Sequence, residues 1–98
     1  MSDGWTFLTN HAHVLLAIAR DPNLRLRDIA ELVGITERTA VGIMSDLESG
    51  GYVRRDKAGR RNRYVLNPDR PLRHPLEAHH EVGELLRAIG HSFTSGAP

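Results

Sequence analysis

Apolar residues recur at helical spacing in three segments of the first half of the chain. These segments predict three helices, over His11–Arg20, Asp28–Val33 and Thr36–Ser49. Thr9 or Asn10 can cap the first helix, because either side chain offers an oxygen to the unpaired N–H groups of the first turn. Gly34 is expected to end the second helix, since glycine adopts the left-handed conformation after a helix at little cost.

After the glycine pair at 50–51 the pattern changes from helical spacing to short alternating runs. Tyr52–Arg55 and Arg63–Leu66 flank a turn at 57–60, which predicts a β-hairpin. Leu24–Leu26 also alternates and is compatible with a short strand. The expected fold class is α+β, mainly helical with one small hairpin.

The segment after the hairpin is rich in turn formers, which predicts a linker. Pro75 suits the first turn of a last helix, expected to run to about Ile89. The chain is therefore expected to divide into an N-terminal extension (1–8), a main domain (9–67), the linker (68–74), a C-terminal dimerisation helix (75–90) and a flexible tail (91–98).

The last helix carries an apolar face that is too broad for a solvated surface helix. The residues expected at a dimer interface are Leu72, Leu76, Val82, Leu86 and Ile89. Part of this face is also expected to pack on the first helix, so an intramolecular core is the alternative. A domain of 98 residues buries a modest share of its surface, and a partner subunit would add stability. We therefore expect a homodimer.

The composition excludes several classes of protein. The chain has no cysteine, which excludes a disulfide framework, a zinc finger, an iron–sulfur site and a nucleophilic thiol. It lacks the apolar run of about 18 residues that a membrane span needs. The segment Met1–Trp5 does not resemble the start of a signal peptide. We expect a cytoplasmic protein without a cofactor.

Charge is distributed unevenly along the chain. The net charge is +1, but residues 54–63 hold six cations and one anion, whereas the rest of the chain holds seven cations and eleven anions. A concentrated basic segment on a mildly acidic body favours a polyanion as partner. A solvated basic loop is the alternative interpretation.

Three stretches, in this order and spacing, carry a resemblance: Asp28–Thr36, Thr39–Val41 and Leu47–Val53. The third stretch contains a leucine, an acid, glycine and two apolar residues where the hairpin begins. Over residues 14–66 the chain resembles the winged helix-turn-helix regulators of the MarR and ArsR type. The resemblance implies that the third helix enters the major groove of duplex DNA and that the hairpin is a basic wing.

The outward side of the third helix is the expected reading surface, because a sharp glycine turn sets the helix at a steep angle to its predecessor. Candidate DNA contacts on this helix are Thr36, Glu37, Arg38, Thr39, Val41, Gly42 and Ser45. Arg38 suits guanine, Glu37 suits a cytosine amine and Val41 suits a thymine methyl group.

The threonines and the glycine of this helix have second interpretations. Thr36 and Thr39 can donate to phosphates, but capping is the expected main role of Thr36, and a packed hydroxyl is the alternative for Thr39. A glycine inside a helix costs about 1 kcal/mol relative to alanine. Gly42 is compatible with close approach to DNA and equally with a neutral surface position.

The hairpin supplies the other predicted contacts. The residues expected to bind phosphates are Lys57, Arg60, Arg61 and Arg63, and an arginine at the tip suits a narrow minor groove. Arg54 and Arg55 are expected to pair with acidic side chains instead.

Six histidines raise the question of a metal site. His79 and His80 are candidate ligands, but adjacent residues point about 100° apart on a helix and suit one ion poorly. Packing, hydrogen bonding or a pH response are the alternatives. ArsR-type proteins include metal sensors, and without thiolates such a site would use nitrogen and oxygen ligands. The existence of a small-molecule or metal effector stays open.

Sequence-specific regulation of transcription is the function that these features favour, most simply by a repressor that binds double-stranded DNA as a homodimer at an inverted repeat. A protein-interaction module or an architectural DNA-binding module without base specificity is the alternative. An enzyme is not expected, because the sequence shows no Ser-His-Asp arrangement and no glycine-rich phosphate loop.

Overall fold

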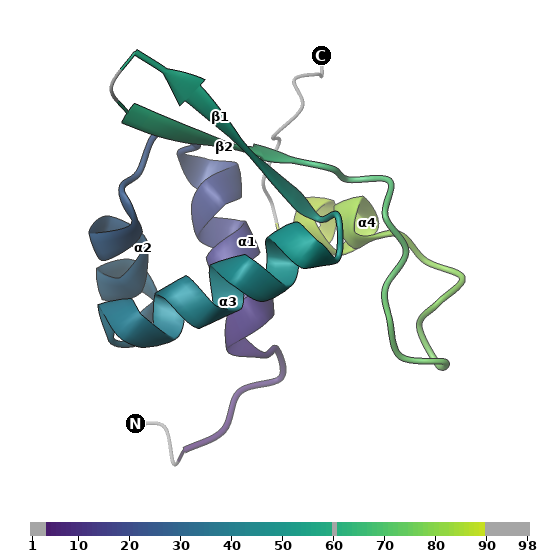
Figure 1. Cartoon of the computed structure of the whole chain (residues 1–98). Helices are drawn as coiled ribbons and strands as arrows, with labels where there is room; N and C mark the ends of the chain where they lie inside the picture. The colour runs from purple at the N-terminus through teal and green to yellow at the C-terminus, as the bar shows by residue number, and fades with distance from the viewer. Residues whose placement is uncertain (1–3, 60, 90–98) are drawn as a thin grey trace.

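The computed structural model describes residues 4–59 and 61–89, which form four helices and an antiparallel hairpin (Figure 1). In chain order the elements are α1 (Asn10–Arg20), α2 (Leu26–Val33), α3 (Glu37–Ser49), β1 (Val53–Ala58), β2 (Arg61–Leu66) and α4 (Val82–Ala88). A helix pair followed by a hairpin is a winged helix, and the expected α+β class is confirmed. Within the described ranges, no helix has the length and apolar character that crossing a membrane requires.

The predicted caps of the first three helices are present. Thr9 Oγ1 accepts a hydrogen bond from the backbone N–H of Ala12 at 3.3 Å, so Thr9 rather than Asn10 caps α1. Thr36 Oγ1 accepts one from Thr39 N at 3.0 Å at the start of α3. Gly34 ends α2 with φ +88°, the left-handed conformation that favours glycine.

Helix α2 begins at Leu26, earlier than the sequence pattern predicts. The reason is a capping box: the backbone N–H of Arg25 donates to Asp28 Oδ2 at 3.3 Å, which fixes the first turn. The alternating residues before α2 therefore form no strand of their own. A backbone hydrogen bond from Tyr64 N to Pro22 O, 3.1 Å long, joins this segment to β2 instead.

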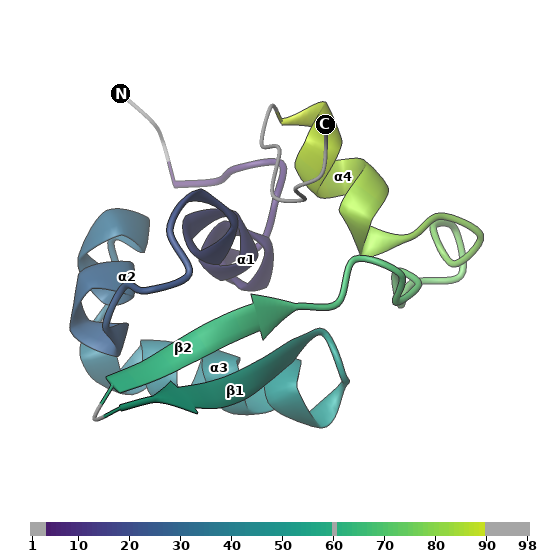
Figure 2. The same ribbon diagram turned by 90° about the horizontal axis from the view of Figure 1, so that it is seen from above.

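The hairpin pairs its strands in register from Val53 opposite Leu66 to Ala58 opposite Arg61. Gly59 begins the turn with φ +70°, a conformation that two-residue hairpin turns require and glycine adopts readily. Strand β1 lies beside α3 and β2 lies beside α1 (Figure 2). The wing is thus packed on the helices rather than projecting as an isolated ribbon.

A single cluster of buried side chains connects these elements. Its most completely buried members are Val14 and Ile18 of α1, Ile29 of α2, Met44 of α3 and Leu86 of α4. Tyr52 and Tyr64 add aromatic area from the start of the wing and from β2. Among the described residues no charged or polar side chain is buried. The core is therefore apolar, and the charges of the chain are left for its surface.

The last helix is shorter than predicted: α4 covers Val82–Ala88, and residues 75–79 form a turn. Two backbone hydrogen bonds explain the difference, from Leu72 N to His80 O and from Val82 N to Arg70 O, each 2.9 Å long. They pair residues 70–72 with residues 80–82, and Glu81 is extended with ψ +152°. A helix that continued through Glu81 would lose both bonds.

Candidate nucleic-acid interface

Helix α3 has one face in the core and one face in solvent. Ala40, Ile43, Met44 and Leu47 are buried, as their spacing predicts. The exposed positions in the first two thirds of the helix are Glu37, Arg38, Thr39, Val41, Gly42 and Ser45. Four of these share one side of the helix, because residues three and four apart are neighbours on a helix surface: Arg38, Val41, Gly42 and Ser45. The structure thus brings most of the predicted reading positions together.

The two threonines at the start of α3 form a local hydrogen-bonded pair. Thr36 Oγ1 donates to Thr39 Oγ1 at 2.9 Å and accepts from the backbone N–H of Thr39. The hydroxyl of Thr36 is therefore engaged in the cap, which is its expected main role. The hydroxyl hydrogen of Thr39 has no acceptor in the part of the chain that the structure describes, so it is available to a phosphate oxygen.

Arg38 and Gly42 are exposed without an internal role. Arg38 makes no hydrogen bond or ion pair with any described residue. A Cβ atom placed on Gly42 would have no atom within 4 Å outside its own stretch of helix. Packing within the fold therefore does not explain the glycine.

The wing presents two exposed cations, Lys57 and Arg63, that make no hydrogen bond or ion pair within residues 4–59 and 61–89. Arg63 lies opposite Asp56 in the strand register and adds a smaller charge effect on that carboxylate. Arg60 lies outside the described residues. The backbone of Arg61, in β2, pairs with Ala58 of β1, and its side chain is not among those described.

The expectation that Arg54 and Arg55 pair with acids is confirmed. Arg54 binds Asp56 at 3.1 Å, and its hydrogen bond and charge hold the pKa of Asp56 below its usual value. Arg55 makes two hydrogen bonds to the Glu48 carboxylate, at 3.0 and 3.1 Å, and lies 6.0 Å from the centre of the Tyr64 ring. The Arg55–Glu48 pair links β1 to the last turn of α3, so it fixes the wing relative to that helix.

The wing tip and the start of α3 lie at the same end of the molecule, with α2 also on that side (Figures 1 and 2). Arg27, in the first turn of α2, is exposed and has no hydrogen bond or ion pair among the described residues. The bond between Pro22 and Tyr64 holds the segment before α2 against the wing. Arg27 therefore joins the candidate interface. The sequence reasoning missed it because it stands apart from the basic segment, and its position at the start of the helix pair was the only signal.

Comparison with known proteins agrees with this arrangement. A sequence model described as MarR family matches residues 5–62, which include all three helices of the main domain and β1. The chain belongs to the MarR family. MarR-family proteins are DNA-binding regulators rather than enzymes, and the chain carries their winged-helix domain. No curated protein matches the sequence.

The predicted dimer residues are divided by the structure. Val82 and Leu86 are 4 % and 0 % exposed and pack in the core of the same chain, so they offer no surface to a partner. That part of the prediction is corrected, because the short α4 needs its apolar face to pack on α1. Leu72 is half-buried against the core, whereas Leu76 and Ile89 are exposed.

The histidines among the described residues make local contacts in pairs. His80 Nδ1 lies 2.7 Å from Glu84 Oε1, and the ring of His79 contacts that of His80 with centroids 4.4 Å apart. His11 Nε2 lies 2.9 Å from Asp46 Oδ2 and joins α1 to α3. Over the described ranges, no three histidine or acidic side chains gather into a group that would hold a metal ion.

Proposed function

We propose that this chain is a sequence-specific transcriptional regulator that binds an inverted repeat in double-stranded DNA as a homodimer, most simply as a repressor. Helix α3 would enter the major groove, and the wing would contact phosphates or the minor groove. The observation that supports the proposal is the set of exposed, unpaired cations at one end of the described structure: Arg38 on α3, with Lys57 and Arg63 on the wing.

The contrast between paired and unpaired cations strengthens the proposal. Arg25, Arg54 and Arg55 neutralise neighbouring carboxylates and leave little charge for a ligand. Arg38 and Arg63 form no hydrogen bond or ion pair with the described residues, and duplex DNA supplies a closely spaced row of phosphates for such side chains. Gly42, next to Arg38 on the same side of α3, leaves room for the helix to approach the bases.

The first experiment is selection of bound duplexes from a random pool by the full chain, followed by sequencing. The proposal expects an inverted repeat with half-sites about one helical turn apart. If each subunit neutralises roughly four phosphates, the logarithm of affinity should fall with the logarithm of salt concentration at a slope near −7. Binding without any enriched sequence would favour the architectural module, and no binding would favour protein docking.

The role of Arg38 is tested on the selected sequence. Arg38→Ala should reduce discrimination at one base pair per half-site by about 1–3 kcal/mol, because a bidentate contact to guanine is lost. Arg54→Ala is the matched control, since Arg54 is also exposed but its charge is already paired with Asp56. A variant of Arg38 that weakens binding to every duplex equally would show a phosphate contact and contradict base recognition.

A further inference from the structure

The largest exposed apolar side chains lie at the N-terminal segment and at the turns after the wing. Phe7 is 92 % exposed, Leu76 is 81 % exposed and Trp5 is 70 % exposed. Scattered apolar residues are common on protein surfaces, but neighbouring large ones mark a surface that another molecule covers. Phe7 lines a groove and Trp5 packs against Phe7, which makes this segment and the groove a candidate interaction surface.

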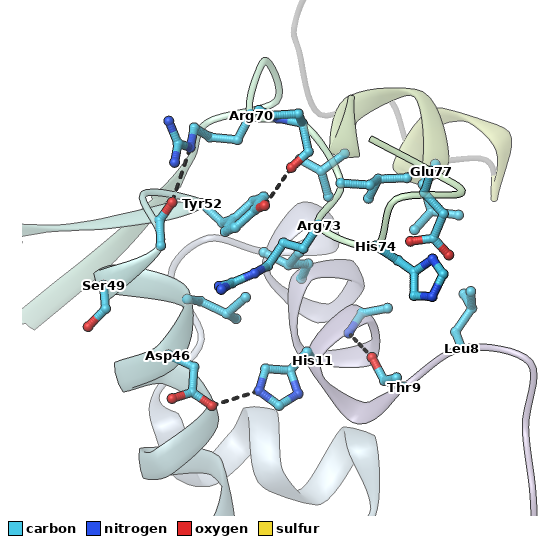
Figure 3. A pocket seen from close by; sticks show the side chains of 18 of the residues that line it. Leu8, Thr9, His11, Asp46, Ser49, Tyr52, Arg70, Arg73, His74 and Glu77 are labelled. Atoms are coloured by element: carbon cyan, nitrogen blue, oxygen red, sulfur yellow. Dashed lines mark hydrogen bonds and ion pairs between the residues drawn. The ribbon is translucent and has the colours of Figure 1, made fainter. Parts of the chain in front are cut away.

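The groove lies between the N-terminal segment, the end of α3 and the turns at 70–77 (Figure 3). Its volume is about 1180 Å³ and it is open to solvent. Phe7 and Leu8 form one wall, while Leu72 and Leu85 contribute apolar surface from the C-terminal region. Polar side chains stand at its rim, including His11 and Asp46, which are hydrogen-bonded to each other.

The N-terminal segment is locally ordered rather than a loose tail. Thr6 Oγ1 donates to the carbonyl oxygen of Leu8 at 2.6 Å, and the ring of Trp5 packs edge-on against Phe7 with centroids 5.2 Å apart. Thr9 then caps α1 and fixes the direction in which the segment leaves the helix. We call residues 4–8 the arm. An arm with a fixed shape loses less conformational entropy on binding than a flexible one.

We propose that the groove receives the arm of a second copy of this chain, in a reciprocal exchange about a two-fold axis. The inference rests on the homodimer of the proposed function and names the surface that forms it. A two-fold interface uses the same patch on both subunits, and here the arm and the groove are neighbours on one patch. Each arm would then lie in the other subunit's groove, beside the arm residues Phe7 and Leu8 that line it.

The area is sufficient for a stable dimer. An aromatic side chain buries roughly 150–250 Å², and most of that area is still exposed on Trp5 and Phe7. Two arms, together with the groove surface that they cover, would bury about 1,000 Å² or more, which is the lower limit of a specific interface. The helix α4 face cannot supply this area, because its apolar residues Val82 and Leu86 are already buried.

Trp5 provides a direct probe, because it is the only tryptophan of the chain. We expect its fluorescence to shift to the blue and to become protected from iodide quenching as protein concentration rises. The transition should coincide with the change from monomer to dimer in sedimentation velocity. A dimer in which Trp5 stays fully quenchable would overturn the arm exchange and leave the proposed DNA-binding function standing.

A variant of the arm, compared with a control variant elsewhere, tests the contact. Trp5→Ser with Phe7→Ser should raise the dimer dissociation constant roughly thirtyfold or more, as truncation of aromatic hot spots does. Leu32→Ser is the matched control, because Leu32 is exposed on α2, away from the groove, and should leave the dissociation constant unchanged. An equal effect of both changes would contradict the proposal.

A mixing experiment distinguishes exchange from a general apolar contact. Ala12→Arg would block the groove from α1, and Ser49→Arg, at an exposed position of α3, would block it if the first variant does not fold. A groove-blocked chain and an arm-deficient chain should each be monomeric alone. Mixed together they should form a heterodimer, because one intact arm meets one intact groove. Absence of that heterodimer would overturn the arm exchange. Failure of the unmodified dimer to bind DNA would instead overturn the proposed function.

Discussion

Helices α3 and α4 each contain a glycine, and the two glycines have opposite surroundings. At Gly42 of α3 an added Cβ would meet nothing within 4 Å. At Gly83 of α4 it would lie 2.8 Å from both the Cβ and the carbonyl oxygen of Pro68. One helix therefore keeps a side that the fold does not use, whereas the glycine side of the other is packed closely against Pro68. The Gly42 side of α3 is available for a ligand, while the Gly83 side of α4 stabilises the fold.

The largest test of this comparison is the core contact of α4. Leu86→Ala should lower the free energy of unfolding by about 2–5 kcal/mol, because it removes a fully buried side chain and leaves a cavity. Leu76→Ala should change it by less than about 0.5 kcal/mol, since Leu76 is mostly in solvent. Urea unfolding followed by circular dichroism measures both. Similar values for the two variants would contradict the assignment of α4 to the core.

Gly83→Ala should have the next largest effect. The added methyl group meets backbone and ring atoms of Pro68, which cannot move aside cheaply because Gly83 N also donates to Pro68 O at 2.9 Å. We expect a loss of about 1–3 kcal/mol in the free energy of unfolding, the usual cost of overpacking. A variant as stable as the natural chain would show that the segment before α4 is free to shift.

Gly42→Ala should act in the opposite direction on stability. The free energy of unfolding is expected to rise by up to about 1 kcal/mol, because alanine favours the helix and the methyl group meets no obstacle. DNA affinity should fall if the backbone of α3 lies close to the bases at this position. Thermal unfolding and DNA titration on the same sample measure the two effects. A stabilised variant with unchanged affinity would remove Gly42 from the interface.

The same contrast explains how much the sequence could predict. The turn between the two helices of the pair was predictable because local signals set it, namely Gly34 after α2 and the Thr36 cap before α3. Arg54 and Arg55 were also predictable as paired residues, since acids lie within reach in the sequence. Family membership adds the expectation of DNA binding, but the individual contact residues of α3 and the wing stay predictions.

The C-terminal region was not predictable by the same means. Its apolar spacing favours a helix from Pro75, yet the hydrogen bonds that prevent it join residues 70–72 to residues 80–82. Such pairing depends on tertiary position, and Tyr52 reinforces it by donating its hydroxyl to the carbonyl of Pro71. The exposure of the arm was not predictable for a related reason, because only the folded chain shows that Trp5 and Phe7 are left uncovered.

The smallest expected effect compares the capping boxes of α2 and α4. The backbone N–H of Arg25 lowers the pKa of Asp28, and the backbone N–H of Glu81, with a further hydrogen bond from His80, lowers the pKa of Glu84. Because both folded pKa values lie below the unfolded ones, each carboxylate stabilises its helix above about pH 4 and loses that effect as the pH falls through the folded pKa.

Amide proton shifts of Arg25 and Glu81, followed by NMR from neutral to acidic pH, measure the two boxes separately. Each shift should titrate with a midpoint below the ordinary value of its carboxyl group, and Asp28→Asn should abolish the titration at Arg25 while leaving that at Glu81. Loss of the capping box of α2, by acid or by Asp28→Asn, should also weaken DNA binding, because α2 supports α3. Loss of the capping box of α4, by Glu84→Gln, should leave DNA affinity unchanged. If both variants weaken DNA binding equally, α4 also contributes to the DNA interface. That result would contradict the assignment of α2 and α3 to DNA binding and of α4 to stability.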